Sequence, residues 1–195
     1  MEDYRTLLGQ GTGEYEEKHS RFIGLAVLNG VRAANRTARH NVYAYVLREG
    51  NRTRYSDDGE PAKTAGLPVL EAIRHAGLTD CVVVVTRYFG GILLGTGGLV
   101  RAYTQAAKLA LEAAPSGTMR VCVRLTVTVE YPLYERADLL LRTAGAHMEE
   151  PEFTHQVTLR CVLPQGEEAP LIPKLQEWSR GAAAIEVSPG FYTAF

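Results

Sequence analysis

The stretch RYFGGILLGTGGLVRAY, residues 87–103, places five glycines within nine residues, with an arginine before them and another after. The segment CVVVVTRYF, residues 81–89, overlaps the start of this stretch and is a continuous run of mostly β-branched residues, which predicts a strand covered on both faces. From about Gly97 to Ala114, apolar residues recur at helical spacing with polar residues on the opposite face. The quoted stretch is therefore predicted to join a buried strand to an amphipathic helix through a glycine-rich loop.

This loop has two interpretations. An arginine at a strand end, a glycine-rich loop and a helix N-terminus together attract anions, because unpaired backbone N–H groups and the helix dipole face the ligand. The candidate nucleic-acid or anion-binding residues here are Arg87, Gly90, Gly91, Gly97, Gly98 and Arg101. No Gly-Lys-Ser/Thr follows the glycines, and the third glycine of the dinucleotide fingerprint is absent, so nucleotide-binding motifs are not matched. Alternatively, the glycines supply positive-φ turns and close helix-to-strand packing.

The second feature is an acidic turn, YSDDGEPAKTAG, residues 55–66. Asp57, Asp58 and Glu60 crowd around Gly59, and neighbouring carboxylates can hold a cation or act as an acid/base pair. The spacing matches no calcium loop, and we predict no metal site, no cofactor and no catalytic constellation. The alternative is that Asp-Gly makes the turn and the acids favour the N-terminus of the following helix.

The third feature is a basic and aromatic stretch between residues 32 and 54, where arginines interleave with tyrosines. Arginines and exposed aromatic rings on a sheet can hold an RNA backbone and stack unpaired bases. The candidate residues are Arg39, His40, Arg52 and Arg54, together with Tyr43, Tyr45 and Tyr55. The other interpretation places the tyrosines in the core and the arginines on a solvated face, and alternation alone does not say which face is buried.

Two domains are predicted, residues 1–115 and 120–195, because the helical pattern stops at Pro115, Ser116 and Gly117 and an alternating pattern follows. The second domain repeats a strand-helix-strand pattern in the order βαββαβ, which is typical of a ferredoxin-like sandwich. The whole chain is thus expected to be α+β. That fold hosts many functions and names none.

Composition narrows the function classes. The net charge is −1, but residues 1–120 carry 15 Lys and Arg against 12 Asp and Glu, while residues 121–195 carry 6 against 10. A polyanion is therefore expected to meet the first part. No signal peptide or membrane-spanning run is evident, and we expect no membrane association. The three cysteines are widely spaced among apolar residues and are predicted to be buried thiols in a reducing cytoplasm.

Four segments, KHSRFIG, RHNVYAYVL, YSDDGEPAKTAGLPVLEAI and VVVVTRYFGGILLGTGGLVRAY, resemble in the same order the signatures of the YigZ/IMPACT family of uncharacterised bacterial proteins and eukaryotic translation regulators. The resemblance covers residues 14–114. It implies a first domain of the ribosomal-protein/elongation-factor β-α-β type and a second domain like the last domain of elongation factor G. There are two departures: Lys63 stands where the family usually has glycine, and segment 22–41 is shorter than usual.

Together these features predict a non-enzymatic, RNA- or ribosome-associated cytoplasmic protein that modulates translation. The first domain would be the contact surface and the second a module for a protein partner. The alternative is a small-molecule or phosphate-dependent enzyme that uses the loop at residues 90–98 and the acidic turn. RNA recognition requires exposed tyrosines and arginines on one sheet face, whereas catalysis requires a closed pocket joining the two loops.

Overall fold

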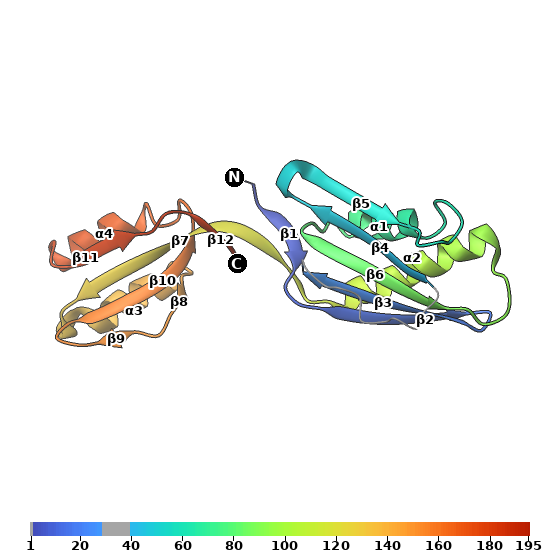
Figure 1. Ribbon diagram of the computed structural model, residues 1–195. Helices are drawn as coiled ribbons and strands as arrows, with labels where there is room; N and C mark the ends of the chain where they lie inside the picture. The colour runs from blue at the N-terminus through green and yellow to red at the C-terminus, as the bar shows by residue number, and fades with distance from the viewer. Residues whose placement is uncertain (1, 29–39) are drawn as a thin grey trace. The chain divides into compact units, whose positions relative to one another are not determined.

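A computed structural model describes residues 2–28 and 40–195 of the chain (Figure 1). Two compact units are present, Tyr4–Thr118 and Met119–Phe195, and the chain up to Asp3 belongs with the second. The division falls within one strand, β7 (Ser116–Val129), which begins directly after Pro115. Proline has no backbone N–H to continue a helix, and the preceding helix ends at Ala113.

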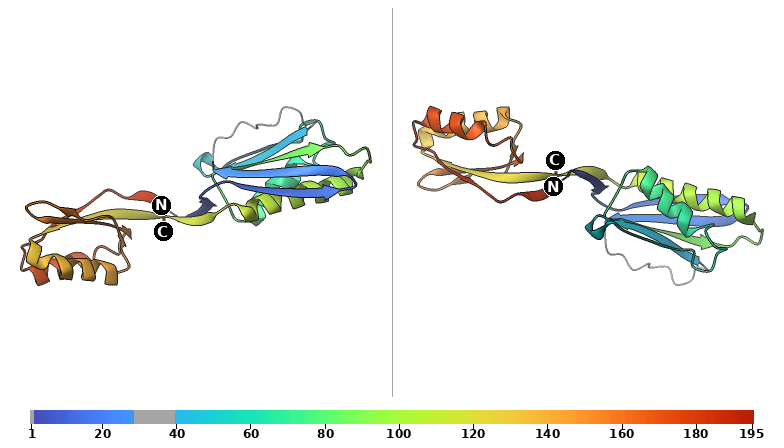
Figure 2. Two further views of the ribbon diagram at one scale, coloured as in Figure 1. Left: turned by 90° about the horizontal axis from the view of Figure 1, so that it is seen from below. Right: turned by 90° about the horizontal axis from the view of Figure 1, so that it is seen from above.

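In its described residues, the first unit is an antiparallel sheet with two helices. The strand order is β2-β3-β6-β4-β5, and β1 (Tyr4–Leu7) precedes these strands in the chain. The strands are β2 (Gly11–Glu17), β3 (Ser20–Leu28), β4 (His40–Leu47), β5 (Arg52–Ser56) and β6 (Cys81–Tyr88), with a 3-10 turn η1 (Glu49–Asn51) between β4 and β5. Helices α1 (Gly66–His75) and α2 (Gly95–Ala113) lie on the same face of this sheet (Figure 2).

The core of the first unit lies between that sheet face and the helices. The central strand β6 directs Val83 and Val85 into it, and both side chains are fully buried. Small residues of α2, including Ala102 and Ala106, let the helix approach the sheet closely, and its Tyr103 packs edge-to-face on Phe22 of β3 with ring centroids 5.1 Å apart. The predicted buried strand is therefore the middle of the sheet.

The second unit is also a sheet with helices on one face (Figure 2). Strand β7 pairs antiparallel with β10 on one side and with β11 and then β12 on the other, while β10 also pairs with β8 and β9. The remaining bounds are η2 (Tyr131–Leu133), α3 (Tyr134–Thr143), β8 (His147–Met148), β9 (Glu152–Phe153), β10 (Val157–Pro164), α4 (Leu171–Ser179), β11 (Ala184–Val187) and β12 (Phe191–Ala194). The chain is α+β, while the named fold types of the two units stay predictions.

Three details differ from the sequence-based expectations or complete them. Helix α2 begins at Gly95, two residues before the predicted start, so three of the five glycines are helical. The last predicted strand is divided into β11 and β12 around Pro189, which has no N–H for the ladder. The cysteines are buried as predicted, and burial raises the pKa of the Cys81 thiol to about 12.

Among the described helices none is long and apolar enough to cross a membrane.

Candidate functional site

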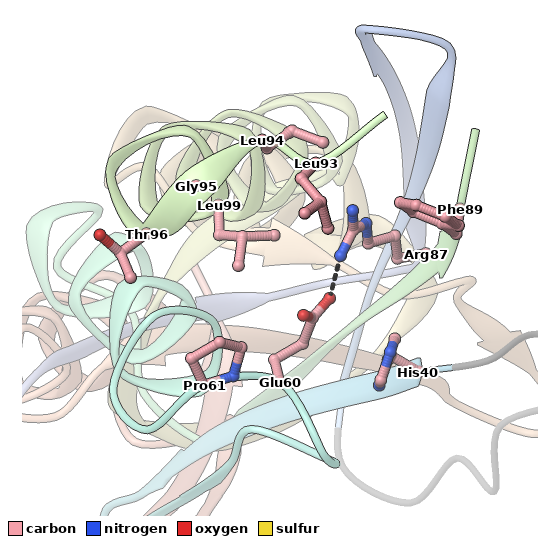
Figure 3. Close-up of a pocket in the computed structure, with 10 residues that line it drawn as sticks. All are labelled: His40, Glu60, Pro61, Arg87, Phe89, Leu93, Leu94, Gly95, Thr96 and Leu99. Atoms are coloured by element: carbon pink, nitrogen blue, oxygen red, sulfur yellow. Dashed lines mark hydrogen bonds and ion pairs between the residues drawn. The ribbon is translucent and has the colours of Figure 1, made fainter. Parts of the chain in front are cut away.

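A pocket of about 350 Å³ lies in the first unit where the acidic turn meets the glycine-rich loop (Figure 3). It is bordered by the start of β4, the end of β6 and the N-terminus of α2. The lining residues are His40, Glu60, Pro61, Arg87, Phe89, Leu93, Leu94, Gly95, Thr96 and Leu99. Two sequence features that are about thirty residues apart in the chain thus form one site.

A buried ion pair forms the polar wall of this pocket. Arg87 Nη1 donates to Glu60 Oε1 at 2.7 Å, and the two side chains are only 6% and 4% exposed. The hydroxyl of Tyr103 donates to the same carboxylate oxygen at 2.8 Å. Burial, followed by the nearby charge of Glu60, raises the pKa of Tyr103 well above its usual value, so this hydroxyl keeps its proton and remains a donor.

The Arg87 guanidinium is held on several sides. It lies 5.5 Å from the centre of the Phe22 ring and 5.4 Å from that of Phe89, within the range of cation–π contacts. Its Nη2 lies 3.5 Å from Ser20 Oγ, which also accepts a hydrogen bond from the Gly90 N–H at 3.2 Å. Its Nε is buried and has no hydrogen-bond partner among the described residues. Arg87 is therefore a fixed part of the first unit rather than a mobile surface cation.

The three carboxylates of the acidic turn have separate tasks. The Asp57 carboxylate accepts hydrogen bonds from the backbone N–H groups at positions 63, 65 and 66, at 2.9, 3.1 and 2.8 Å, and so satisfies the N-terminus of α1. The Asp58 carboxylate accepts from the Asn41 N–H at 2.6 Å. Only Glu60 lines the pocket. No group of three or more His, Cys, Asp or Glu side chains in residues 2–28 and 40–195 is arranged to hold a metal ion.

His40 reaches the pocket from the start of β4. Its Nδ1 lies 2.7 Å from the Asp58 carbonyl oxygen. A carbonyl oxygen only accepts, so Nδ1 carries the proton and Nε2 is the ring nitrogen left for other partners. The turn thereby orients His40 as well as Glu60.

Arg101 does not join Arg87 in a shared anion site. Because α2 begins at Gly95, Arg101 lies in the second turn of the helix. Its side chain is 72% exposed, and its Nη2 lies 3.7 Å from Glu17 Oε1. It is absent from the pocket lining, and Arg87 is paired with Glu60 rather than with Asp57 or Asp58. The predicted cradle of two arginines around one anion is therefore not formed.

The glycines of the loop divide between two environments. Gly90 and Gly91 lie in the connection between β6 and α2, and Gly91 has φ +86°. Gly97 and Gly98 lie within the first turns of α2, where Gly98 is buried. The stretch therefore contains a tight connection and a helix start rather than one continuous loop.

Four of the basic and aromatic residues of β4 and β5, Tyr43, Tyr45, Arg52 and Arg54, lie on the sheet face opposite the helices. Val42 and Ala44 are buried toward the helices, so Tyr43 and Tyr45 project from the other face, where both are half-buried. Arg54 is directly opposite Tyr45, and Arg52 opposite Leu47, and both arginines are exposed. Tyr55 is opposite Ala44 and packs against the core instead. Arg39 lies outside the described residues.

Lys63 has a backbone conformation that favours glycine. Its φ is +64°, in the left-handed region, and its N–H donates to the Asp57 carboxylate. A side chain in this region strains the backbone by about 1–2 kcal/mol. The conformation explains why glycine suits this position of the turn.

Replacing Lys63 with Gly is therefore expected to stabilise the chain by about 0.5–1 kcal/mol, after the greater flexibility of glycine in the unfolded chain is subtracted. Urea denaturation followed by circular dichroism measures the change. Lys63→Ala is the matched control, because it removes the side chain but keeps the strain. An equal gain in both variants would mean that the lysine side chain, and not the backbone, is unfavourable.

Sequence reasoning missed several residues that line the pocket, and also Tyr103, which contacts the pocket residue Glu60. The helical spacing predicts only that Leu99 and Tyr103 lie on the apolar face of the helix, and it predicts no role for Leu93, Leu94 and Thr96. For Tyr103 a signal existed, because a tyrosine on a buried helix face needs a partner for its hydroxyl. For the leucines none existed, since their position depends on how the connection after β6 folds back.

Comparisons with known proteins cover both units. The Impact N-terminal domain matches residues 18–111, and a domain of unknown function, DUF1949, matches residues 127–182. The chain is 43% identical over 150 residues to the IMPACT family member in pol 5'region of Thermus thermophilus, covering 76% of this chain and 82% of that one. It is 35% identical over 184 residues to the IMPACT family member YigZ of Escherichia coli strain K12, covering 87% and 90%. A crystal structure of a hypothetical protein aligns with a TM-score of 0.59 at 33% identity, over 95% of this chain and 97% of that one.

Proposed function

The chain belongs to the IMPACT family, and from this we propose that it is a non-enzymatic, RNA- or ribosome-associated protein of the cytoplasm that acts in translation. The sequence motifs resemble those of a family whose eukaryotic members are translation regulators, and this resemblance supports the link to translation. In this proposal the first unit has an elongation-factor-like fold and contacts RNA. The second, ferredoxin-like unit carries a protein partner.

The observation that carries the proposal is the shared face of β4 and β5. Tyr45 and Arg54 are cross-strand neighbours there, and Tyr43 and Arg52 lie on the same face. Exposed guanidinium groups contact phosphates, and neighbouring aromatic rings stack on unpaired bases. Both kinds of group lie in the part of the chain with the positive charge excess.

The test is a filter-binding titration of the full chain with single-stranded RNA at several salt concentrations. Arg54→Ala is expected to weaken binding and to reduce the salt slope by about 1, because one phosphate contact is lost. Tyr45→Leu keeps an apolar side chain but removes stacking, which is worth about 1–3 kcal/mol per base. Arg101→Ala is the control, since Arg101 is an exposed arginine on a helix of the opposite layer. Equal losses in all three variants, or no RNA binding, would contradict the proposed surface.

The pocket favours a second candidate, a small-molecule enzyme, because it joins the two loops as such an enzyme requires. The carboxylates in and near the pocket already have partners, which favours ligand binding over acid/base catalysis. Glu60 is paired with Arg87, and the carboxylates of Asp57 and Asp58 are occupied by backbone N–H groups. The RNA-associated function remains the one we propose.

A further inference from the structure

We propose that the pocket beside Glu60 and Arg87 binds a nucleoside through an uncharged base that bears an exocyclic amino group. This site lies on the helix side of the sheet and is separate from the face proposed for RNA, so the inference does not rest on the proposed function. Its volume of about 350 Å³ is at the lower end of the range of small-molecule sites, ~300–1,000 Å³.

The charge of the pocket wall selects an uncharged ligand group. Glu60 and Arg87 neutralise each other, and both side chains are more than nine-tenths buried. A further charge brought into this wall would be desolvated without a counterion of its own. Arg101, the other arginine expected to bind a phosphate, lies elsewhere. A nucleoside therefore fits the pocket better than a nucleotide whose phosphate enters it.

The pocket wall offers hydrogen-bond acceptors, so a ligand that binds there needs a hydrogen-bond donor. Oε1 of Glu60 receives both the Arg87 and the Tyr103 hydrogen bonds, whereas within the described residues Oε2 receives none. In Figure 3 this second oxygen points away from Arg87, on the side of the pocket where Pro61 lies. His40 offers Nε2 as another acceptor, because its Nδ1–H is used by the Asp58 carbonyl. An exocyclic amino group supplies two N–H donors for such acceptors.

The start of α2 supplies complementary donors. Gly95 and Thr96 line the pocket and belong to the first turn, whose N–H groups have no partners within the helix. No side chain in the described part of the chain caps this end of the helix. A nucleobase carries ring nitrogens or carbonyl oxygens next to its amino group, and these can accept from backbone N–H groups while the amino group faces Glu60.

The apolar walls suit a flat ring. Phe89 and Leu93 border the pocket although they are 39% and 82% exposed, and Leu99 is buried beneath. An aromatic ring and aliphatic side chains around a few placed polar groups are typical of small-molecule sites. A bound base would cover apolar surface that is otherwise in contact with water.

Isothermal titration of the full chain with adenosine, guanosine, cytidine, uridine and inorganic phosphate tests this. At least one amino-bearing nucleoside is expected to bind at least tenfold more tightly than uridine, which has no exocyclic amino group, and phosphate alone is expected not to bind. Phe89→Ala should weaken the binding at least fivefold. Ile92→Ala is the matched control, because Ile92 lies in the same connection, is 46% exposed and does not line the pocket.

The backbone amide NMR signals of Gly95 and Thr96 provide a readout that needs no variant, and both are expected to shift when the preferred nucleoside is added. Uridine binding as tight as the others, phosphate binding alone, unshifted amides, or equal losses in Phe89→Ala and Ile92→Ala would each overturn the inference. Arg54→Ala should leave nucleoside affinity unchanged, and Phe89→Ala should leave RNA affinity unchanged. These two variants therefore distinguish an error in the proposed nucleoside site from an error in the proposed RNA surface.

Discussion

Replacing Arg87 with Met is expected to lower the free energy of unfolding by about 3–5 kcal/mol, because Glu60 is left buried without its cation. The Tyr103 hydroxyl remains as a donor to Glu60, but a single neutral donor does not replace a guanidinium. The rings of Phe22 and Phe89 also lose their cation, and methionine replaces only the apolar part of the arginine. Urea denaturation monitored by circular dichroism measures the loss.

The double variant Arg87→Met, Glu60→Leu separates the uncompensated charge from the lost packing. If the buried charge dominates, the double variant is expected to recover most of the stability, since buried ion pairs are often replaced by apolar side chains at little cost. Arg74→Met is a surface control: Arg74 is paired with Glu71 on α1, and both side chains are about half exposed, so little change is expected. A large loss in the double variant would show that the pair contributes through its hydrogen bonds and shape instead.

The sequence predicted the two loops of the site but not their meeting. A run of β-branched residues before the glycines and helical spacing after them are local patterns, and strand β6 and helix α2 follow from them. The contact between Glu60 and Arg87 joins positions 27 residues apart, and no local pattern encodes which carboxylate meets the arginine. The backbone of the turn decides this. Asp58 and Gly59 have φ of +45° and +83°, so consecutive carboxylates point in different directions.

The burial of β4 shows the same limit. Its alternation separated Tyr43 and Tyr45 from Val42 and Ala44, and this separation is found in the strand. Which set faces the core depends on where α1 packs, and that is a tertiary contact. Tyr55 illustrates the consequence, because it was grouped with the other tyrosines yet lies on the core face, opposite Ala44.

The largest effect of a single added methyl group is expected at Gly90. A Cβ built there would lie 2.0 Å from both the carbonyl carbon and the carbonyl oxygen of His19, and 2.5 Å from the Ser20 nitrogen. All three are backbone atoms, in the turn after β2 and at the first residue of β3, so no side chain can rotate away to make room. The Gly90 N–H also donates to Ser20 Oγ, next to Arg87 Nη2. Gly90→Ala must therefore displace the connection that leads from β6 to the pocket.

We expect Gly90→Ala to cost at least about 3 kcal/mol of stability in urea denaturation, at the upper end of overpacking effects because the clash is with backbone. Gly97→Ala in α2 is the matched control: its Cβ would meet only the end of the Arg101 side chain, at 3.8 Å, and alanine should stabilise the helix by about 0.5–1 kcal/mol. Opposite signs in the two variants would mean that Gly90 is required for a close approach of two backbones, whereas no packing contact requires glycine at position 97. If Gly90→Ala is as stable as Gly97→Ala, packing does not require glycine at position 90. Close contact between a ligand and the backbone would then be the better explanation for glycine at both positions.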